Sequence, residues 1–254
     1  CSFTPFTTGG LIVEEGASGF SLVPNNNAQR TLILGRAGTE EPVLFTVRED
    51  FSLGSSSNAW GPVNVNADWN VLVANGKTLN VYGALNSSGR TITVGGEGFS
   101  GTLVLNNAAN ASMTAEWVIT SGSTVRCMNN SALGSGLVTL DGGTLDFNSQ
   151  TIGSTITLNM SGTGTLQNVT VDGAILSYTS SSGNDGITAS NTTWTSGKID
   201  IGRLLQGFSA EGSNTVDLGA ELGEGFSVLG LDPGQYRIEG SVLTIEDGAI
   251  SSVT

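Results

Sequence analysis

The stretch GSTVRCMNNSALGSGLVTLDGGTLDF, residues 122–147, decides the fold of this chain. It holds two copies of a short pattern in which a glycine is followed closely by threonine and then by alternating apolar side chains. Such alternation is typical of a β-strand with one buried face, because successive side chains of a strand point to opposite sides. The stretch therefore predicts short strands separated by glycine-rich turns.

The same pattern recurs through the middle of the chain, with starts at Gly76, Gly89, Gly101, Gly153 and Gly164. Its apolar residues fall into two interleaved series with a period of about 20 residues, as expected if each coil of a solenoid places them above those of the previous coil. The first series is Leu79, Leu103, Val125, Leu145, Leu166 and Ile187, and the second is Ile92, Trp117, Val138, Ile156, Ile175 and Trp194. We therefore expect an all-β, right-handed parallel β-helix (β-solenoid) with distinct N- and C-terminal caps.

Two other all-β architectures use similar short strands. A sandwich of antiparallel strands or an antiparallel barrel also has glycine-rich turns, and Asn75-Gly76 and Asp141-Gly142 both fit the turn of a hairpin. Similarity between coils, rather than between neighbouring strands, favours the solenoid.

The organisation along the chain follows from where this repeat is readable. Residues 1–60 carry apolar pieces of different character and most of the local acid pairs, which predicts an N-terminal cap or irregular first coils. Residues 61–201 form the expected parallel β-helix. Residues 202–254 are more charged and end in two short apolar runs, which predicts a C-terminal cap with a β-hairpin that covers the open strand edges.

Composition limits the partners and the location. The chain has 254 residues, 37 of them glycine, and 22 acids against nine bases give a formal net charge of −13. This charge disfavours nucleic acid and anionic membrane surfaces as partners. No apolar run is long enough for a transmembrane helix. Acidic, glycine-rich and strand-forming composition is consistent with a secreted protein.

The segment from Ala132 to Leu145 resembles the autotransporter-associated β-strand repeat of bacterial passenger domains. Weaker copies run from Ser100 to Leu105 and from Ser161 to Leu166. The resemblance implies export to the bacterial cell surface and a right-handed parallel β-helix, and it implies no particular activity, since the family includes adhesins, stalks and some enzymes.

The absence of histidine limits the chemistry that the chain can perform. It removes Ser-His-Asp and Cys-His catalysis and every zinc site that needs histidine. Two separate cysteines make no cysteine-only zinc site, and no glycine-rich loop carries the lysine of a phosphate-binding loop. We expect no cofactor, no metal and no catalytic residue.

A polysaccharide hydrolase or lyase is the enzyme alternative. The sequence Asn184-Asp185-Gly186-Ile187 resembles part of the catalytic strip of polygalacturonase-like enzymes, which makes Asp185 the candidate acid. Hydrolysis needs a second, converging carboxylate, and none can be paired with it from the sequence. The simpler interpretation places Asp185 in a turn.

Tryptophans offer a possible carbohydrate platform. Trp60 and Trp69 flank the boundary of the N-terminal cap and are the candidate ligand-binding residues, whereas Trp117 and Trp194 fall in an apolar series and are expected in the core. An ice-binding face would need continuous Thr-x-Thr columns, which the pattern does not provide.

The two cysteines leave several interpretations open. Cys127 alternates with Val125 and is expected to be a small buried side chain. Cys1 pairs with it only if the N-terminus folds back; Cys1-Ser2 also fits a lipid-bearing lipoprotein terminus, and the simpler interpretation is that the printed sequence starts there.

The function that demands least of these residues is a secreted or surface-displayed bacterial structural and adhesive β-helix. Its expected partners are other copies of the chain, in an oligomer or filament, or host glycans or matrix. A glycan-active enzyme or a glycan-binding module on the same scaffold is the alternative.

Overall fold

The computed structural model describes residues 6–17, 19–24, 30–36, 41–106, 113–153, 157–179 and 187–201, and short strands beyond them at 203–205, 208–210, 213–217, 221–222, 242–246 and 249–253. Within these ranges the chain is all-β, without a helix, and its parallel strands stack as a β-solenoid of about six turns. The predicted solenoid is therefore confirmed. The sandwich and the barrel are excluded, because the described strands between residues 6 and 210 pair in parallel.

The chain divides into two compact units, Cys1–Gly136 and Leu137–Thr254. The strands of the first unit are β1 (Phe6–Thr8), β2 (Gly10–Val13), β3 (Ser21–Leu22), β4 (Leu32–Leu34), β5 (Val43–Val47), β6 (Phe51–Leu53), β7 (Val63–Val65), β8 (Trp69–Val73), β9 (Thr78–Val81), β10 (Leu85–Asn86), β11 (Ser88–Val94), β12 (Thr102–Leu105), β13 (Thr114–Thr120) and β14 (Thr124–Cys127).

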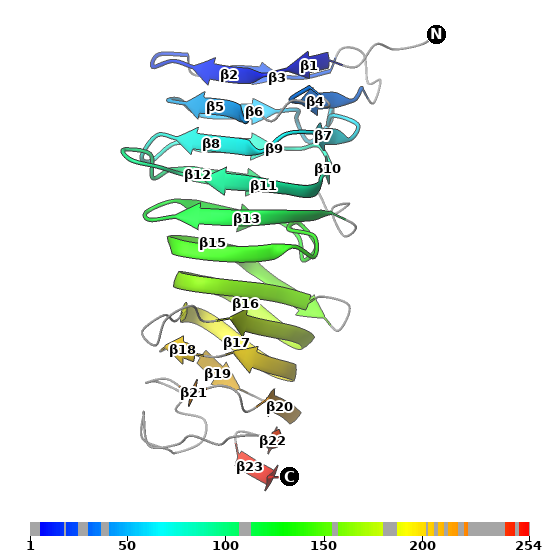
Figure 1. Cartoon of the computed structure of the whole chain (residues 1–254), viewed down its shortest axis with the longest axis vertical. Helices are drawn as coiled ribbons and strands as arrows, with labels where there is room; N and C mark the ends of the chain where they lie inside the picture. Colours follow the sequence, from blue (N-terminus) through cyan, green and yellow to red (C-terminus); the bar gives the residue numbers. More distant parts are fainter. Residues whose placement is uncertain are drawn as a thin grey trace. The chain divides into compact units, whose positions relative to one another are not determined.

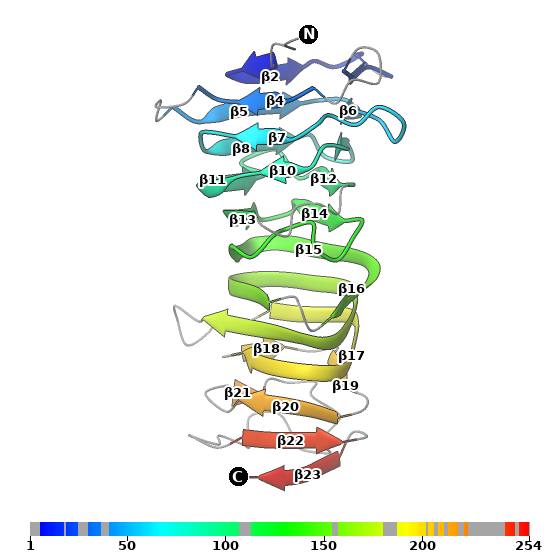
Figure 2. The same cartoon turned by 90° about the vertical axis from the view of Figure 1, so that its right-hand side faces the viewer.

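Three parallel ladders build the first unit. One joins β1, β4, β7 and β10, of which the last three follow one another in Figure 2. A second joins β2, β5, β8, β11 and β13, whose first three strands lie one above another in Figure 1. The third joins β3, β6, β9, β12 and β14. Regular register thus begins at β1, inside the segment that the sequence separates as a cap or irregular coils.

The register aligns the apolar residues in columns. Leu79 pairs with Leu103, which pairs with Val125, as the first series predicts. Ile92 pairs with Trp117, as the second series predicts, and also with Trp69. All of these side chains are fully buried, so the columns form the core. The buried position of Cys127 is likewise confirmed.

Glycines of the quoted stretch sit where one coil touches the next. A Cβ atom on Gly134 would overlap the carbonyl oxygen of Met113, and one on Gly136 would overlap that of Ala115. Gly134 also has a φ of 73°, which L side chains rarely adopt. Glycine is therefore required here by the close approach of two backbones.

Among its described residues, the second unit contains three long strands, which bend at the corners of the coils, and six short ones. They are β15 (Leu137–Gly153), β16 (Thr157–Thr179), β17 (Ile187–Ile201), β18 (Arg203–Leu205), β19 (Phe208–Ala210), β20 (Ser213–Asp217), β21 (Glu221–Leu222), β22 (Val242–Glu246) and β23 (Ala249–Val253). β15, β16 and β17 pair in parallel, whereas β20, β22 and β23 pair antiparallel. A parallel ladder therefore gives way to an antiparallel one within residues 213–253.

The register corrects part of the predicted series in this unit. Leu145 pairs with Leu166 as expected, but Leu166 pairs with Ala189 rather than with Ile187. Val138 pairs with Met160 rather than with Ile156, a position outside the described residues.

Trp194 departs from its predicted place in the second series. It pairs with Val171 rather than with Ile175, whose partner is Lys198. Bulges at the coil corners, such as that between Asp146 and Gln150 of β15, add residues to one coil and not to its neighbour. A constant period therefore selects the wrong partner.

Candidate functional site

Charged side chains of the first unit gather where β2, β5 and β8 end. The connections that follow these strands carry Glu14 and Glu15, then Arg48, Glu49 and Asp50, then Lys77. The chain must leave the sheet at each of these points, so polar residues stay near solvent while apolar residues fill the strands. We call this set, with Gly16 and Thr78, the charged corner.

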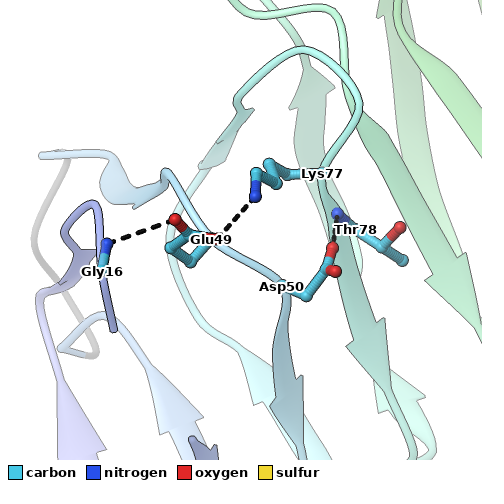
Figure 3. Close-up of polar contacts among 5 residues, drawn as sticks. All are labelled: Gly16, Glu49, Asp50, Lys77 and Thr78. Carbon is cyan, nitrogen blue, oxygen red and sulfur yellow. Dashed lines mark hydrogen bonds and ion pairs between the residues drawn. The ribbon is translucent and has the colours of Figure 1, made fainter. Parts of the chain in front are cut away.

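Glu49 is the centre of the charged corner (Figure 3). Its Oε2 lies 2.6 Å from Nζ of Lys77, and its Oε1 accepts a hydrogen bond from the backbone N–H of Gly16 at 3.2 Å. The Glu49 side chain is 18% exposed, which is less than the 35% of Lys77. One carboxylate thus joins residues of three successive coils.

The electrostatics of this pair favour the charged forms. The Lys77 hydrogen bond, followed by that from Gly16, lowers the pKa of Glu49 below its usual value. The Glu49 carboxylate in turn raises the pKa of Lys77. A general base or a nucleophilic lysine needs the opposite shifts, toward neutrality near pH 7, so the pair suits a structural role better than a catalytic one.

The neighbouring residues of the charged corner also link coils. Asp50 accepts a hydrogen bond from the backbone N–H of Thr78 at 2.8 Å, as Figure 3 shows. Nε of Arg48 lies 3.4 Å from a carboxylate oxygen of Glu14, and its guanidinium carbon lies 5.7 Å from the centre of the Phe99 ring. These contacts reach from the first coil to the fourth.

Uncharged side chains on the strands repeat this coil-to-coil pairing. Asn86 donates to Asn64 at 3.1 Å, and Asn106 donates to Asn80 at 3.4 Å. Asn64 and Asn86 are partners in the register of β7 and β10, and Asn106, which follows β12, reaches the amide of Asn80 in the preceding coil. These outer polar side chains therefore join adjacent coils to one another.

A buried carboxylate in the second unit was not recognised from the sequence. Asp146 is only 1% exposed, and its Oδ1 accepts hydrogen bonds from the backbone N–H of Asn148 at 2.8 Å and from Nδ2 of Asn168 at 3.0 Å. Asn148 and Asn168 both have positive φ, at 50° and 54°. The spacing Asp-x-Asn, which is typical of an Asx turn, was the available signal.

The two tryptophans predicted to bind a ligand lie in the core. Trp69 is fully buried, and its ring meets that of Phe45 edge to face at 5.2 Å. Trp60 is 6% exposed, and its Nε1 donates to the carbonyl of Leu22 at 2.9 Å. Stacking on a sugar requires an open indole face, and neither side chain presents one in this structure. Trp117 is buried as predicted, and it donates to the carbonyl of Leu133 at 3.0 Å.

The other predicted positions lie beyond what the structure describes. Asp185 and Cys1 both fall outside the described residues, so neither the catalytic alternative nor a Cys1–Cys127 pair is tested. Only the backbone is described for Trp194. Among the described residues, no three side chains of the metal-ligating types lie close enough together to hold an ion.

No described helix has the length and apolar character needed to cross a membrane. Comparison with known proteins gives no relative of this chain, because no family model, no curated protein and no solved structure matches it. The resemblance of residues 132–145 to an autotransporter-associated repeat therefore depends on these residues alone.

Proposed function

We propose that the chain is a secreted or surface-displayed structural module, a stiff spacer that holds an adhesive or assembled surface away from a bacterial cell. The observation that carries this proposal is the use of outer polar side chains as links between coils, above all Glu49 between Gly16 and Lys77. Side chains that are bonded to the next coil are not arranged around a substrate.

Linked coils give a solenoid resistance to separation. The strands of each coil pair only with those of adjacent coils, so the strength of the whole depends on every interface between coils. Here each interface combines backbone ladders, buried apolar columns and contacts such as Asn86 with Asn64. This construction suits a load-bearing stalk.

Composition and resemblance support the location. A net charge of −13 keeps an exported protein soluble and disfavours nucleic acid as a partner. Residues 132–145 resemble a repeat of surface-exported passenger domains. The proposed partners are host glycans, matrix or further copies of the chain.

Cell fractionation and protease treatment of intact cells test the location. We expect the chain in the surface or medium fraction, and accessible to added protease. Recovery in the cytosol only would contradict the proposal.

A polysaccharide-cleavage assay tests the enzyme alternative. Purified chain and its Asp185→Asn variant are incubated with a panel of acidic and neutral polysaccharides, and new reducing ends and unsaturated products are measured. We expect no turnover from either protein. Turnover by the wild type that the variant lacks would replace the structural role with a catalytic one.

A further inference from the structure

Asn75-Gly76 is the only Asn-Gly pair in the chain, and it forms the tip of the turn between β8 and β9. The N–H of Lys77 donates to the carbonyl of Ala74 at 3.0 Å and closes this turn. Gly76 has a φ of 71° at the third position, where a type II turn needs a residue with positive φ. β8 and β9 pair with strands of other coils and not with each other, so the pair lies at a corner of a coil rather than in a hairpin.

The tip of this turn is open to solvent. Asn75 and Gly76 are both exposed, and no atom lies within 4 Å of the position that a Cβ atom on Gly76 would take. Among the described residues, neither the side-chain amide of Asn75 nor the N–H of Gly76 has a hydrogen-bond partner. The amide carbon of the asparagine and the backbone nitrogen of the glycine can therefore approach each other, with no side chain of residue 76 in the way.

Two other described asparagines lack one of these conditions. The side-chain amide of Asn86 donates to another asparagine, and Ser87, which follows it, is buried. Asn148 is exposed, but the serine that follows it carries a Cβ atom that hinders attack by its nitrogen. Exposure, a free amide and a following glycine thus coincide at Asn75.

We propose that Asn75 is a site of spontaneous deamidation, in which the chain modifies itself without an enzyme. Hydroxide removes the proton from the Gly76 nitrogen, this nitrogen attacks Cγ of Asn75, and the side-chain nitrogen takes a proton from water and leaves as ammonia. Water then opens the resulting succinimide ring at either carbonyl. Opening at Cγ gives aspartate, and opening at the main-chain carbonyl gives isoaspartate, in which the backbone runs through Cβ and gains one carbon atom.

Neighbouring coils hold both ends of the turn, so a longer backbone cannot be accommodated without breaking a contact. The N–H of Ala74 donates to the carbonyl of Val47 at 2.8 Å. The carbonyl of Lys77 accepts a hydrogen bond from the N–H of Thr102 at 2.9 Å. Isoaspartate at position 75 should therefore break the bond that closes the turn and displace Lys77 from Glu49, whereas aspartate adds only a charge.

Peptide mapping of the full chain by mass spectrometry tests the proposal. The folded chain is incubated at mildly alkaline and at mildly acidic pH, and each asparagine is followed for the mass gain of deamidation. We expect Asn75 to be modified first, and faster at the alkaline pH because hydroxide starts the reaction, with aspartate and isoaspartate as separate products. Asn75→Gln is the matched control. The ring that glutamine must close is larger and forms more slowly, so this position should stay unmodified.

Melting temperatures test the effect on the charged corner. Chain that has been incubated until Asn75 is fully converted contains isoaspartate. It should melt at a lower temperature than freshly prepared Asn75→Asp, which carries the same charge without the added backbone atom.

Two results of the mapping would overturn the proposal. They are an unmodified Asn75 in the folded chain, and modification of Asn86 and Asn148 as fast as that of Asn75. Equal melting temperatures of the converted chain and Asn75→Asp would overturn the effect on the charged corner.

Discussion

Trp69 and Trp117 share one column of the core but differ in a single contact. Both side chains are fully buried, and both pair with Ile92 through the backbone of their strands. Nε1 of Trp117 donates to the carbonyl of Leu133, whereas Nε1 of Trp69 is buried and has no hydrogen-bond partner among the described residues. A buried donor without a partner costs free energy, so the two indoles contribute differently to stability.

This difference predicts the outcome of two matched substitutions. Trp117→Phe leaves the Leu133 carbonyl without this donor and should lower the free energy of unfolding by about 1–3 kcal/mol more than Trp69→Phe, which removes an unbonded donor. Both variants lose similar ring volume, so each controls for the other. Urea denaturation measures the difference, and an equal loss in the two variants would contradict it.

The Glu49–Lys77 pair predicts a dependence of stability on pH. Because the folded pKa of Glu49 lies below its usual value of 4.5, the carboxylate stabilises the fold fully above that value. The contribution disappears as the pH falls through the lowered pKa. On the alkaline side, the raised pKa of Lys77 keeps the contribution until the pH rises above the usual 10.5.

Glu49→Gln should therefore flatten the acid limb of the stability curve. The melting temperature of the wild type should fall more steeply than that of Glu49→Gln between about pH 5 and about pH 3. Glu97→Gln, which changes an exposed glutamate of a later turn, serves as the control, and its melting temperature should change with pH as that of the wild type does. If the melting temperatures of the wild type and of Glu49→Gln fall equally steeply at acid pH, the Glu49–Lys77 pair does not contribute to stability.

At the scale of elements, the contact between two coils sets which residues a turn accepts. Gly136 lies against the carbonyl of Ala115 so closely that a methyl group would overlap it. Gly9, in contrast, has no atom within 4 Å of the position that a Cβ atom would take. The same residue type is thus required at one turn and replaceable at another.

Gly136→Ala should destabilise the chain by about 1–3 kcal/mol or more, because the backbone of a packed coil must move to admit the methyl group. Gly9→Ala should change stability by less than about 0.5 kcal/mol. Thermal melting followed by circular dichroism compares them. Equal melting temperatures would show that the coils separate easily at this point.

At the scale of the whole molecule, the stacking of coils makes one coil equivalent to the next. Leu103 pairs with Leu79 in the next strand of its ladder. Trp69, Ile92 and Trp117 occupy the same register position in three successive strands of another ladder. A coil can then be removed if the cut joins equivalent positions, because the strands of each coil pair only with strands of the adjacent coils. A cut that joins non-equivalent positions breaks every column below it.

Deletion of residues 79–102 should therefore leave a folded, shortened solenoid with a lower melting temperature, since Leu103 then takes the place of Leu79. Deletion of residues 79–90 should prevent cooperative folding, because it leaves half a coil. Circular dichroism and melting of the two variants test this. Cooperative melting of the second variant would contradict the equivalence of the coils.

How far the sequence predicts this protein depends on the contacts that each residue makes. The columns Leu79–Leu103–Val125 and Ile92–Trp117 were predictable, because turns of similar length separate strands with the same alternation. The partners of Leu166 and Trp194 were not, because bulges change the length of a coil without changing the local pattern. The burial of Trp60 and Trp69, the candidate ligand-binding residues, was not predictable for a related reason, since it depends on neighbours far away in the sequence, such as Leu22 for Trp60 and Phe45 for Trp69.

The sequence by itself determined that the chain is an all-β solenoid of short glycine-separated strands, with an apolar core and without histidine chemistry. Both the alternation along a strand and the repetition between coils can be read from the order of the residues alone. Only the tertiary structure decided which polar residues meet. Glu14, Glu49 and Lys77 lie far apart in the sequence, in the connections that follow three different strands. They belong to one charged corner because the solenoid stacks these connections so closely that a side chain of one coil reaches the next.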